Sequence, residues 1–292
     1  LGKKAQIVLD QVTSSLRPLK EGFTTEKGYP PDMFVSSERA LELTDYNTLV
    51  MVVDVNRPSH TECPGLLKRT DSIVVFDHHR QSSEVISNPV LSYIEPYASS
   101  TCEMVAEVLQ YFTENIKLAP HEADCIYAGI LIDTSNFMTK TGVRTFEAAA
   151  YLKRCGAEVT RVRKMLRNDM DAYKARAEVV RHAEVYRGAF AISICPADKI
   201  ESPTIVGAQA ADELLNIVGI KASFVLTEYQ GKIYVSSRSI DEINVQKIME
   251  RLGGGGHLNM AGCQLRDCTV SQAQRIIEDT IDEMLEEGDI EE

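Results

Sequence analysis

The chain has 292 residues and a mass of 32.5 kDa, enough for two ordinary domains, because single cores usually span roughly 100–200 residues. With 44% hydrophobic and 25% charged residues it is not a disordered chain, and its longest apolar runs are strand-sized, too short to span a bilayer. The formal net charge of −12 repels long polyanions and so excludes a protein that grips long nucleic acid without sequence preference. A small nucleotide is the better ligand.

Seven cysteines are scattered along the chain, with no CxxC pair among them. This pattern is typical of reduced thiols rather than of a disulfide framework. A zinc site at Cys263 and Cys268 would need two further ligands, and their spacing gives it little support.

The first half of the chain alternates short β-branched runs with longer amphipathic runs. This pattern predicts an α/β domain with a mostly parallel, Rossmann-like sheet flanked by helices. The expected strands are Ala5–Leu9, Thr48–Asp54, Ser72–Phe76 and Leu91–Glu95. The second and third are apolar until they reach Asp54 and Asp77, so we expect both to be buried on both faces. Ligands of open α/β sheets bind beyond the carboxyl ends of the strands, which places the two acids in one crevice.

Two helices are expected to follow these strands. Ser100 and Glu103 have the spacing of a capping box and predict a helix to about Phe112. The neighbouring Ser99 and Thr101 could contact a substrate, although a cap explains this stretch equally well. A second helix from His121 delivers Asp133 at its end, where the carboxylate either caps the next turn or faces a ligand.

The remaining residues predict a helical linker and a smaller α+β domain. We expect the first, catalytic domain over residues 1–155, the linker over 156–187 and the second domain over 188–292. Expected linker helices are Val159–Leu166 and Ala172–Tyr186. The second domain is expected to contain strands Ala189–Cys195, Ala222–Tyr229, Lys232–Ser237 and Gly262–Leu265, and helices Thr204–Val218, Val245–Leu252 and Ser271–Glu287.

A glycine run, Gly253, Gly254, Gly255 and Gly256, precedes His257. Without Cβ atoms, its backbone N–H groups could close on an anion, and the imidazole could donate a further hydrogen bond. The ordinary alternative is a flexible linker.

Asp54, His78 and Asp133 are each expected at the end of a secondary-structure element. Carboxylate and imidazole are ligands that Mn²⁺ accepts, and three such residues at element ends favour a binuclear site over ordinary polar groups of a core. In a site of this kind a carboxylate such as Asp54 bridges the metals and activated water attacks phosphorus.

The chain resembles DHH phosphoesterases with their DHH-associated C-terminal domain, and in particular the GdpP-type cyclic-di-AMP phosphodiesterases. The motifs that carry the resemblance are Val52–Pro58, Asp77–Arg80, Ile94–Thr101, Gly129–Thr134, Val206–Asp212 and Gly253–His257. They occur in the family's order and cover nearly the whole chain.

The resemblance implies that Asp54, His78 and His79 are catalytic. It implies that Asp54 bridges two Mn²⁺ ions, that His78 and Asp133 ligate the second, and that His79 reaches the ligands or the scissile phosphate. It also implies that the second domain holds the nucleotide through the glycine run, His257, Ser237 and Arg238. An ordinary salt bridge remains an equal alternative for Arg238.

The family's opening motif, HxxxDxDxxGA, is not found before Ala5. We expect it upstream of this numbering, and we expect residues 1–292 alone to hold metal poorly. The resemblance further implies a parent protein tethered to a bacterial membrane, with this soluble part on the cytoplasmic side, and is compatible with a homodimer.

The leading functional hypothesis is hydrolysis of cyclic di-AMP to pApA, with cyclic di-GMP to pGpG as a secondary reaction. The alternatives are a short-oligonucleotide nuclease of the same superfamily and a catalytically silent nucleotide-sensing module. The choice between adenine and guanine depends on loops that the sequence does not place.

Overall fold

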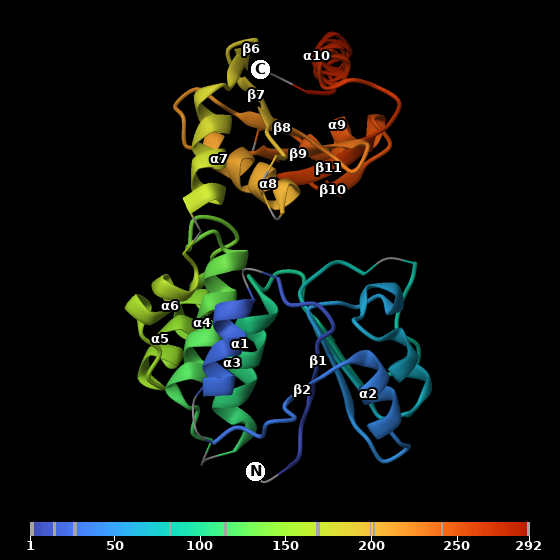
Figure 1. Ribbon diagram of the computed structural model, residues 1–292, viewed down its shortest axis with the longest axis vertical. Helices are drawn as coiled ribbons and strands as arrows, with labels where there is room; N and C mark the ends of the chain where they lie inside the picture. Colours follow the sequence, from blue (N-terminus) through green and yellow to red (C-terminus); the bar gives the residue numbers. More distant parts are fainter. Residues whose placement is uncertain are drawn as a thin grey trace. The chain divides into compact units, whose positions relative to one another are not determined.

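The structure is a computed structural model that describes residues 3–13, 16–25, 28–81, 83–113, 116–167, 170–198, 200, 202–240 and 242–290. The chain divides into two compact units, residues 1–167 and residues 168–292 (Figure 1). None of the helices within the described ranges is long and apolar enough to cross a lipid bilayer.

The first unit contains a parallel three-stranded sheet in the order β3-β4-β5. Its strands are β3 (Val50–Val53), β4 (Ile73–Asp77) and β5 (Leu91–Ile94). A separate parallel pair joins β1 (Ile7–Val8) to β2 (Phe34–Val35), so the strand expected over Ala5–Leu9 is only two residues long. The prediction of parallel strands flanked by helices is confirmed.

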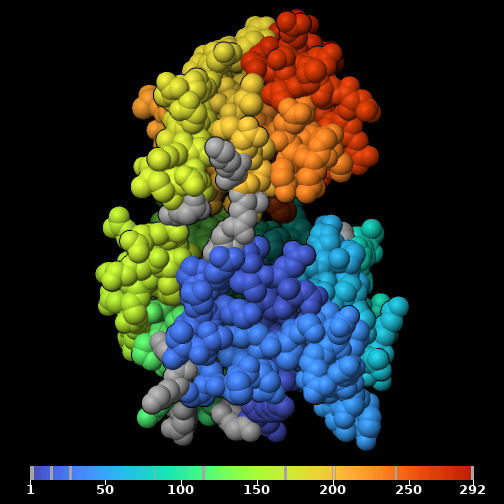
Figure 2. Space-filling view, viewed as in Figure 1, coloured from blue at the N-terminus to red at the C-terminus, as the bar shows by residue number. Residues whose placement is uncertain are grey.

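Helices and short 3₁₀ turns complete this unit. They are α1 (Arg17–Thr25), α2 (Ser37–Leu43), η1 (Pro58–His60), η2 (Pro64–Lys68), α3 (Thr101–Phe112), α4 (Pro120–Asp133), α5 (Val143–Arg154) and α6 (Val159–Met165). Helices α3 and α4 approach closely at Gly129, where an added Cβ would lie 2.3 Å from Cys102 Sγ. In Figure 2 the blue residues at the start of the chain form much of the visible surface of this unit.

The two strands that were expected to be buried on both faces differ. Every residue of β4 is buried, which confirms the prediction for that strand. For β3 the prediction is wrong, because Met51 is 58% and Val53 is 52% exposed. Strand β3 is the edge strand of the described sheet, whereas Met104 of α3 packs against Val74 and Phe76 of the central strand β4.

The second unit is built on a six-stranded sheet in the order β10-β11-β9-β8-β7-β6, in which only β7 and β8 are parallel neighbours. Its elements are α7 (Met170–Arg181), β6 (Glu184–Tyr186), β7 (Phe190–Cys195), α8 (Pro203–Leu214), β8 (Ala222–Tyr229), β9 (Lys232–Ser239), α9 (Val245–Arg251), β10 (Gly255–His257), β11 (Met260–Leu265) and α10 (Val270–Glu286). The predicted α+β architecture is therefore present.

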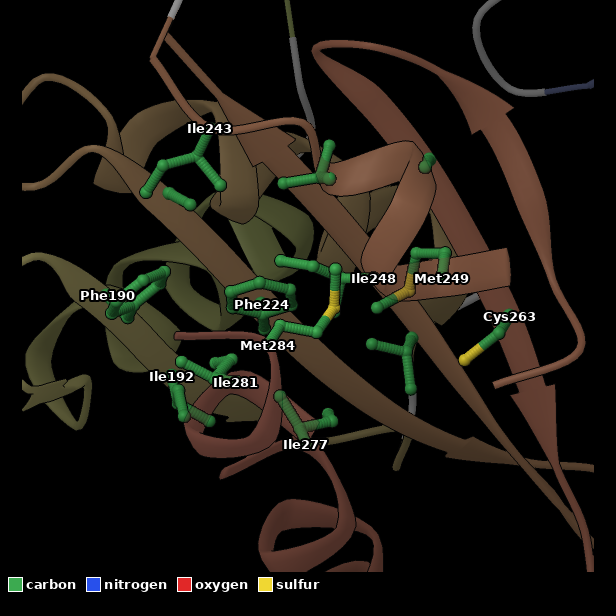
Figure 3. Packing of buried hydrophobic residues seen from close by; sticks show 14 of the residues in the cluster. Phe190, Ile192, Phe224, Ile243, Ile248, Met249, Cys263, Ile277, Ile281 and Met284 are labelled. Atoms are coloured by element: carbon green, nitrogen blue, oxygen red, sulfur yellow. The ribbon is translucent and has the colours of Figure 1, made fainter. Parts of the chain in front are cut away.

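Helices cover both faces of this sheet. Helices α9 and α10 enclose a core in which Phe224, Ile248 and Met284 point toward one another (Figure 3). Helices α7 and α8 cover the other face through residues such as Val179 and Leu214.

The segment expected to form a helical linker is divided between the two units. Helix α6 packs against α4 in the first unit, whereas α7 packs against α8 and β7 in the second. The expected helix over Ala172–Tyr186 is wrong at its end, because Glu184–Tyr186 pair with β7 as an antiparallel strand.

Candidate metal centre

Asp54 lies directly after β3 and turns the chain out of the sheet. Its φ of +65° is in the left-handed region, which Asp tolerates better than most residues. The backbone N–H still donates to Phe76 O at 2.9 Å, so the residue stays tied to β4. Its Oδ1 accepts a hydrogen bond of 2.8 Å from Thr101 Oγ1, and the side chain is 54% exposed. Thr101 therefore orients this carboxylate.

His78 follows β4, and its imidazole is buried. Its Nδ1 lies 3.3 Å from Ala98 O, and a carbonyl can only accept, so Nδ1 carries the proton. Nε2 is left as a lone-pair donor and lies 3.6 Å from Asp54 Oδ1 and 3.8 Å from Asp133 Oδ2. Two ligand atoms that share a divalent ion at about 2.0–2.2 Å can be at most about 4.4 Å apart, so His78 Nε2 could share a cation with either carboxylate.

Asp77 is fully buried, and both of its carboxylate oxygens accept hydrogen bonds. It accepts hydrogen bonds from His79 Nδ1 at 2.7 Å, from His79 N at 3.1 Å and from Asn56 Nδ2 at 2.6 Å. Burial alone would raise the pKa of Asp77, but the bonds from His79 bring it below its ordinary value. The same bond raises the pKa of His79, although burial opposes the change. Asp77 thus orients His79 and leaves the other ring nitrogen toward the cluster.

Asp54, His78 and His79 each offer a ligand atom, and these atoms all lie within 4.8 Å of one another. Asp133 adds a second carboxylate from the end of α4. Burial, and then the nearby charge of Asp54, raise the pKa of Asp133. A bound cation would relieve this repulsion, which is the second reason that the residues fit a metal ion.

The chain that follows Asp133 is strained. Ser135, Asn136 and Phe137 all have positive φ, at a cost of roughly 1–2 kcal/mol for each residue other than Asn. Met138 N closes this turn on Thr134 O at 2.8 Å, and Thr134 is fully buried. The strain is concentrated beside a candidate ligand, where backbone outliers commonly have a functional role.

A buried ionic network supports the loop between β5 and α3. Ser99 Oγ donates to Glu103 Oε2 at 2.5 Å, and Ser100 caps α3 by accepting from Glu103 N. Arg144 binds Glu107 with two bonds of 2.7 Å and lies 3.9 Å from Glu103 Oε1. The predicted capping box forms only in part, because the Glu103 carboxylate bonds Ser99 rather than the backbone.

Three residues of this region had no role in the sequence-based prediction. Asn56 could have been noticed as a polar residue two positions after Asp54, at the end of an apolar strand. Glu103 was interpreted as a capping residue. Arg144 lies far from the motifs in sequence, and nothing in its neighbourhood signals the contact.

In the second unit the glycine run forms an edge strand instead of a flexible linker. Gly253 has φ +76°, and Cβ atoms at Gly254 and Gly256 would lie 2.2 Å from Gly262 O and 2.5 Å from Ala261 Cα. Gly253 and Gly255 have open space around their Cβ positions, although the positive φ of Gly253 disfavours other residues there. Pairing with β11 therefore explains most of the run, and its contact with a nucleotide, together with that of His257, stays a prediction.

The two other residues predicted to bind substrate have partners within this unit. Arg238 Nε donates to Asp212 Oδ1 at 2.7 Å, and its side chain is only 11% exposed. Burial raises the pKa of Asp212, although Arg238 opposes the rise. Ser237 is buried and donates to Ala261 O at 2.9 Å. The ion-pair alternative for Arg238 is present, and substrate binding by both residues stays a prediction.

The first unit thus combines a parallel sheet with a cluster of Asp and His at the carboxyl ends of its strands, which defines an α/β protein with a candidate site for divalent cations. Residues 5–130 match the DHH family, N-terminal domain, and residues 190–287 match the DHHA1 domain. The chain belongs to the DHH family.

Its relatives include named enzymes. It is 44% identical to the cyclic-di-AMP phosphodiesterase GdpP of Geobacillus thermodenitrificans, over 87% of this chain and 39% of that protein. It is 42% identical to the cyclic-di-AMP phosphodiesterase PdeA of Listeria monocytogenes, over 85% of this chain and 38% of that protein. The chain therefore spans about two fifths of the length of these curated relatives.

The fold has a counterpart among solved structures. An exopolyphosphatase-related protein from Bacteroides fragilis superposes with a TM-score of 0.76 and 18% identity, over 93% of this chain and 88% of that one. At this identity the similarity supports the fold alone.

Proposed function

We propose that this chain is the hydrolytic part of a phosphodiesterase that converts cyclic di-AMP to linear pApA, with cyclic di-GMP to pGpG as a secondary reaction. The observation that carries the proposal is the position of His78 Nε2, which lies 3.6 Å from Asp54 Oδ1 and 3.8 Å from Asp133 Oδ2 with its other ring nitrogen committed to Ala98 O. The names of the GdpP and PdeA relatives supply the substrate class.

In this proposal Asp54, His78 and Asp133 hold divalent cations, with Mn²⁺ as the ion and two ions in the complete site. When bound, such ions activate water and offset charge on the phosphate oxygens. The chain's own residues orient the ligands: Thr101 fixes Asp54, and Ala98 O fixes the His78 tautomer. His79, oriented by Asp77, presents its second nitrogen to a cation or to a phosphate oxygen.

Product analysis tests the proposal directly. We expect linear pApA when the longer protein that includes the upstream family motif is incubated with cyclic di-AMP and Mn²⁺, and no product when a chelator is added. Absence of linear product from that longer protein would overturn the proposed activity. Relative rates on cyclic di-AMP, pApA and longer oligonucleotides separate it from a short-oligonucleotide nuclease.

The proposal includes a further strand that completes the metal centre. Strand β3 offers an unpaired edge among the described strands, and its exposed Met51 and Val53 would be covered by such a neighbour. We therefore expect weak Mn²⁺ binding by residues 1–292 in a calorimetric titration. Tight binding of two ions would remove this part of the proposal.

A silent sensing module is the second outcome of the same set of measurements. Cyclic di-AMP that binds in chelator and is never cleaved would favour sensing. Membrane attachment through upstream residues and homodimer formation also belong to the proposal, and membrane fractionation of the longer protein and sedimentation of this chain test them.

A further inference from the structure

Tyr97 lies beside the candidate metal centre, and its side chain is almost entirely uncovered. The residue is 94% exposed, more than any other aromatic residue in the described ranges. It follows β5 at the same end of the sheet as Asp54 and His78, and its neighbour Ala98 is the residue whose carbonyl accepts the bond from His78 Nδ1.

The backbone that carries this ring is held in place. Glu95 N donates to Asp77 O at 3.0 Å, and Ala98 N closes a turn on Glu95 O at 3.0 Å. Tyr97 N itself donates to Glu95 Oε1 at 3.2 Å, and Pro96 has a restricted φ. The next residue, Ala98, is buried. The Tyr97 ring is therefore exposed to solvent, while the backbone that carries it is fixed by hydrogen bonds.

Other exposed aromatic residues of the described ranges are accounted for differently. Phe146 stacks on Phe137 with ring centroids 5.5 Å apart, and Arg176 lies over the Tyr173 ring at 5.3 Å. Tyr111 is 89% exposed but lies ten residues beyond Thr101 on α3, about 15 Å along the helix axis. Tyr97 differs from these rings because it adjoins the candidate metal centre.

Cations held by Asp54, His78 and Asp133 would contact the phosphate of a nucleotide rather than its base. Asp54 and Asp133 are acidic, and the chain has a net charge of −12, so the protein's own charge does not favour an anionic ligand. Stacking of a base on an aromatic ring adds about 1–3 kcal/mol per base and needs no positive charge. A tyrosine also loses little conformational entropy when it packs.

We propose that Tyr97 is a stacking platform for the nucleobase next to the scissile phosphate of a dinucleotide. This inference rests on the proposed phosphodiesterase function, because it needs a phosphate at His78 and His79. Tyr97 directly precedes Ala98, whose carbonyl accepts from His78 Nδ1, and Thr101, four residues further on, donates to Asp54, so the ring is attached to the segment that orients two of the proposed ligands. The stacking contact accepts either purine, which agrees with a secondary reaction on cyclic di-GMP.

The first test compares Tyr97→Ala with Tyr97→Phe in the full-length protein. We expect Tyr97→Ala to raise the KM for cyclic di-AMP by roughly 5- to 150-fold, equivalent to the stacking energy, while Tyr97→Phe stays near wild type. The matched control is Tyr111→Ala, which should leave KM unchanged. The abasic cyclic diribose diphosphate has the same phosphodiester ring without bases, and Tyr97→Ala should cleave it as the wild type does.

The second test measures binding without catalysis. The chain has no tryptophan, so Tyr97→Trp introduces a single indole at the platform. In chelator, we expect cyclic di-AMP and AMP to quench its fluorescence, ribose 5-phosphate to leave it unchanged, and Tyr111→Trp to respond to none of them. These titrations report on stacking even when no product forms.

The outcomes separate this inference from the proposed function. If wild type forms linear product and Tyr97→Ala keeps the wild-type KM, the stacking platform is wrong while the activity stands. Equal losses on the natural and abasic substrates would make Tyr97 a structural residue and also overturn the inference. If wild type forms no product but nucleotides quench Tyr97→Trp selectively, the activity fails and the platform stands.

Discussion

The first unit buries ionisable side chains, whereas the second buries aliphatic and aromatic ones. In the described ranges, the buried Asp, Glu and His residues are Asp77, His78, Glu103, His121 and Asp124, all of the first unit. The buried polar side chains of the second unit are serine and threonine hydroxyls. Burial of a charge is costly unless it is paired and hydrogen-bonded, so the first unit must supply a partner for each group.

Those partners are present, and several of them are distant in sequence. Asp124 binds Arg161, Glu103 lies between Ser99 and Arg144, and His121 contacts Leu19 O. The buried apolar residues described in the first unit form four separate clusters, while those described in the second unit form two, one on each face of a single sheet. From this comparison we predict that substitutions in the candidate metal centre of the first unit affect activity most, and that substitutions in the apolar core of the second unit affect stability most.

The largest expected effect tests the chemical role of the first unit. Asp54→Asn keeps an oxygen for Thr101 but removes the charge that a cation needs. We expect a loss on the order of 10³-fold in the rate of cyclic di-AMP hydrolysis, since several kcal/mol of metal stabilisation are removed. The stability of the apo protein should change by less than about 0.5 kcal/mol because the side chain is exposed. Asp71→Asn, at an exposed site outside the cluster, is the control for rate and thermal unfolding.

Phe224→Ala tests the scaffold role of the second unit. Phe224 is fully buried at the centre of its core, so we expect a loss of about 3–5 kcal/mol in the unfolding free energy of that unit. Denaturant unfolding measures the loss, and Val218→Ala, at a fully exposed site, should have almost no effect. Metal binding at Asp54 should persist at denaturant concentrations below the lowered unfolding midpoint of the second unit. Loss of metal binding in the still-folded protein would contradict the division of roles.

Asn56→Ala tests whether a residue behind the ligands matters to the chemistry. Its amide holds Asp77 at 2.6 Å and the His79 carbonyl at 3.2 Å, so its loss frees the group that orients His79. We expect a decrease of about 10- to 100-fold in kcat or in metal affinity, as is usual for partners of metal ligands. Rates and Mn²⁺ titrations measure it, with the exposed Asn47→Ala as control. An unchanged kcat and metal affinity would reduce Asn56 to a packing residue.

The pH dependence of stability should also distinguish the two units. The lowered pKa of Asp77 means that its contribution is fully present above 3.8 and is lost as pH falls through its folded value. The raised pKa of His79 means that its contribution is fully present below 6.5 and is lost as pH rises through its folded value. In chelator the first unit should therefore be most stable between pH 3.8 and pH 6.5. Asp77→Asn should make its stability depend less on pH. Thermal unfolding across this range checks the expectation, and a second-unit transition with the same shape would contradict the comparison.

The parts of the fold that could be predicted from the sequence are those determined by local residue patterns. The apolar run ending in Asp77, His78 and His79 predicted a buried strand and a polar cluster at its end, and β4 has that form. Ser100 predicted the start of α3 because an N-cap acts within a few residues.

The parts that could not be predicted depend on long-range contacts. Nothing near Arg144 in sequence indicates that it binds Glu107 across two helices. The glycine run suggested an open loop, because only the partner strand reveals that Gly254 and Gly256 are needed for close approach. Likewise, the apolar residues of β3 predicted burial, whereas exposure depends on which neighbours a strand has.

The smallest expected effect tests whether the backbone preference of a single turn residue contributes to the stability of the second unit. Gln230 and Gly231 form the two-residue turn between β8 and β9, with φ of +50° and +71°. Turns of this kind favour Asn followed by Gly, so Gln230→Asn should raise the unfolding free energy by about 0.5 kcal/mol. Gln230→Val should lower it by about 1–2 kcal/mol, because a β-branched residue is strained at positive φ. Denaturant midpoints at constant m-value measure both changes. Opposite signs at one exposed position would identify backbone conformation as the cause, whereas two changes of the same sign would mean that the hairpin contributes through side-chain contacts instead.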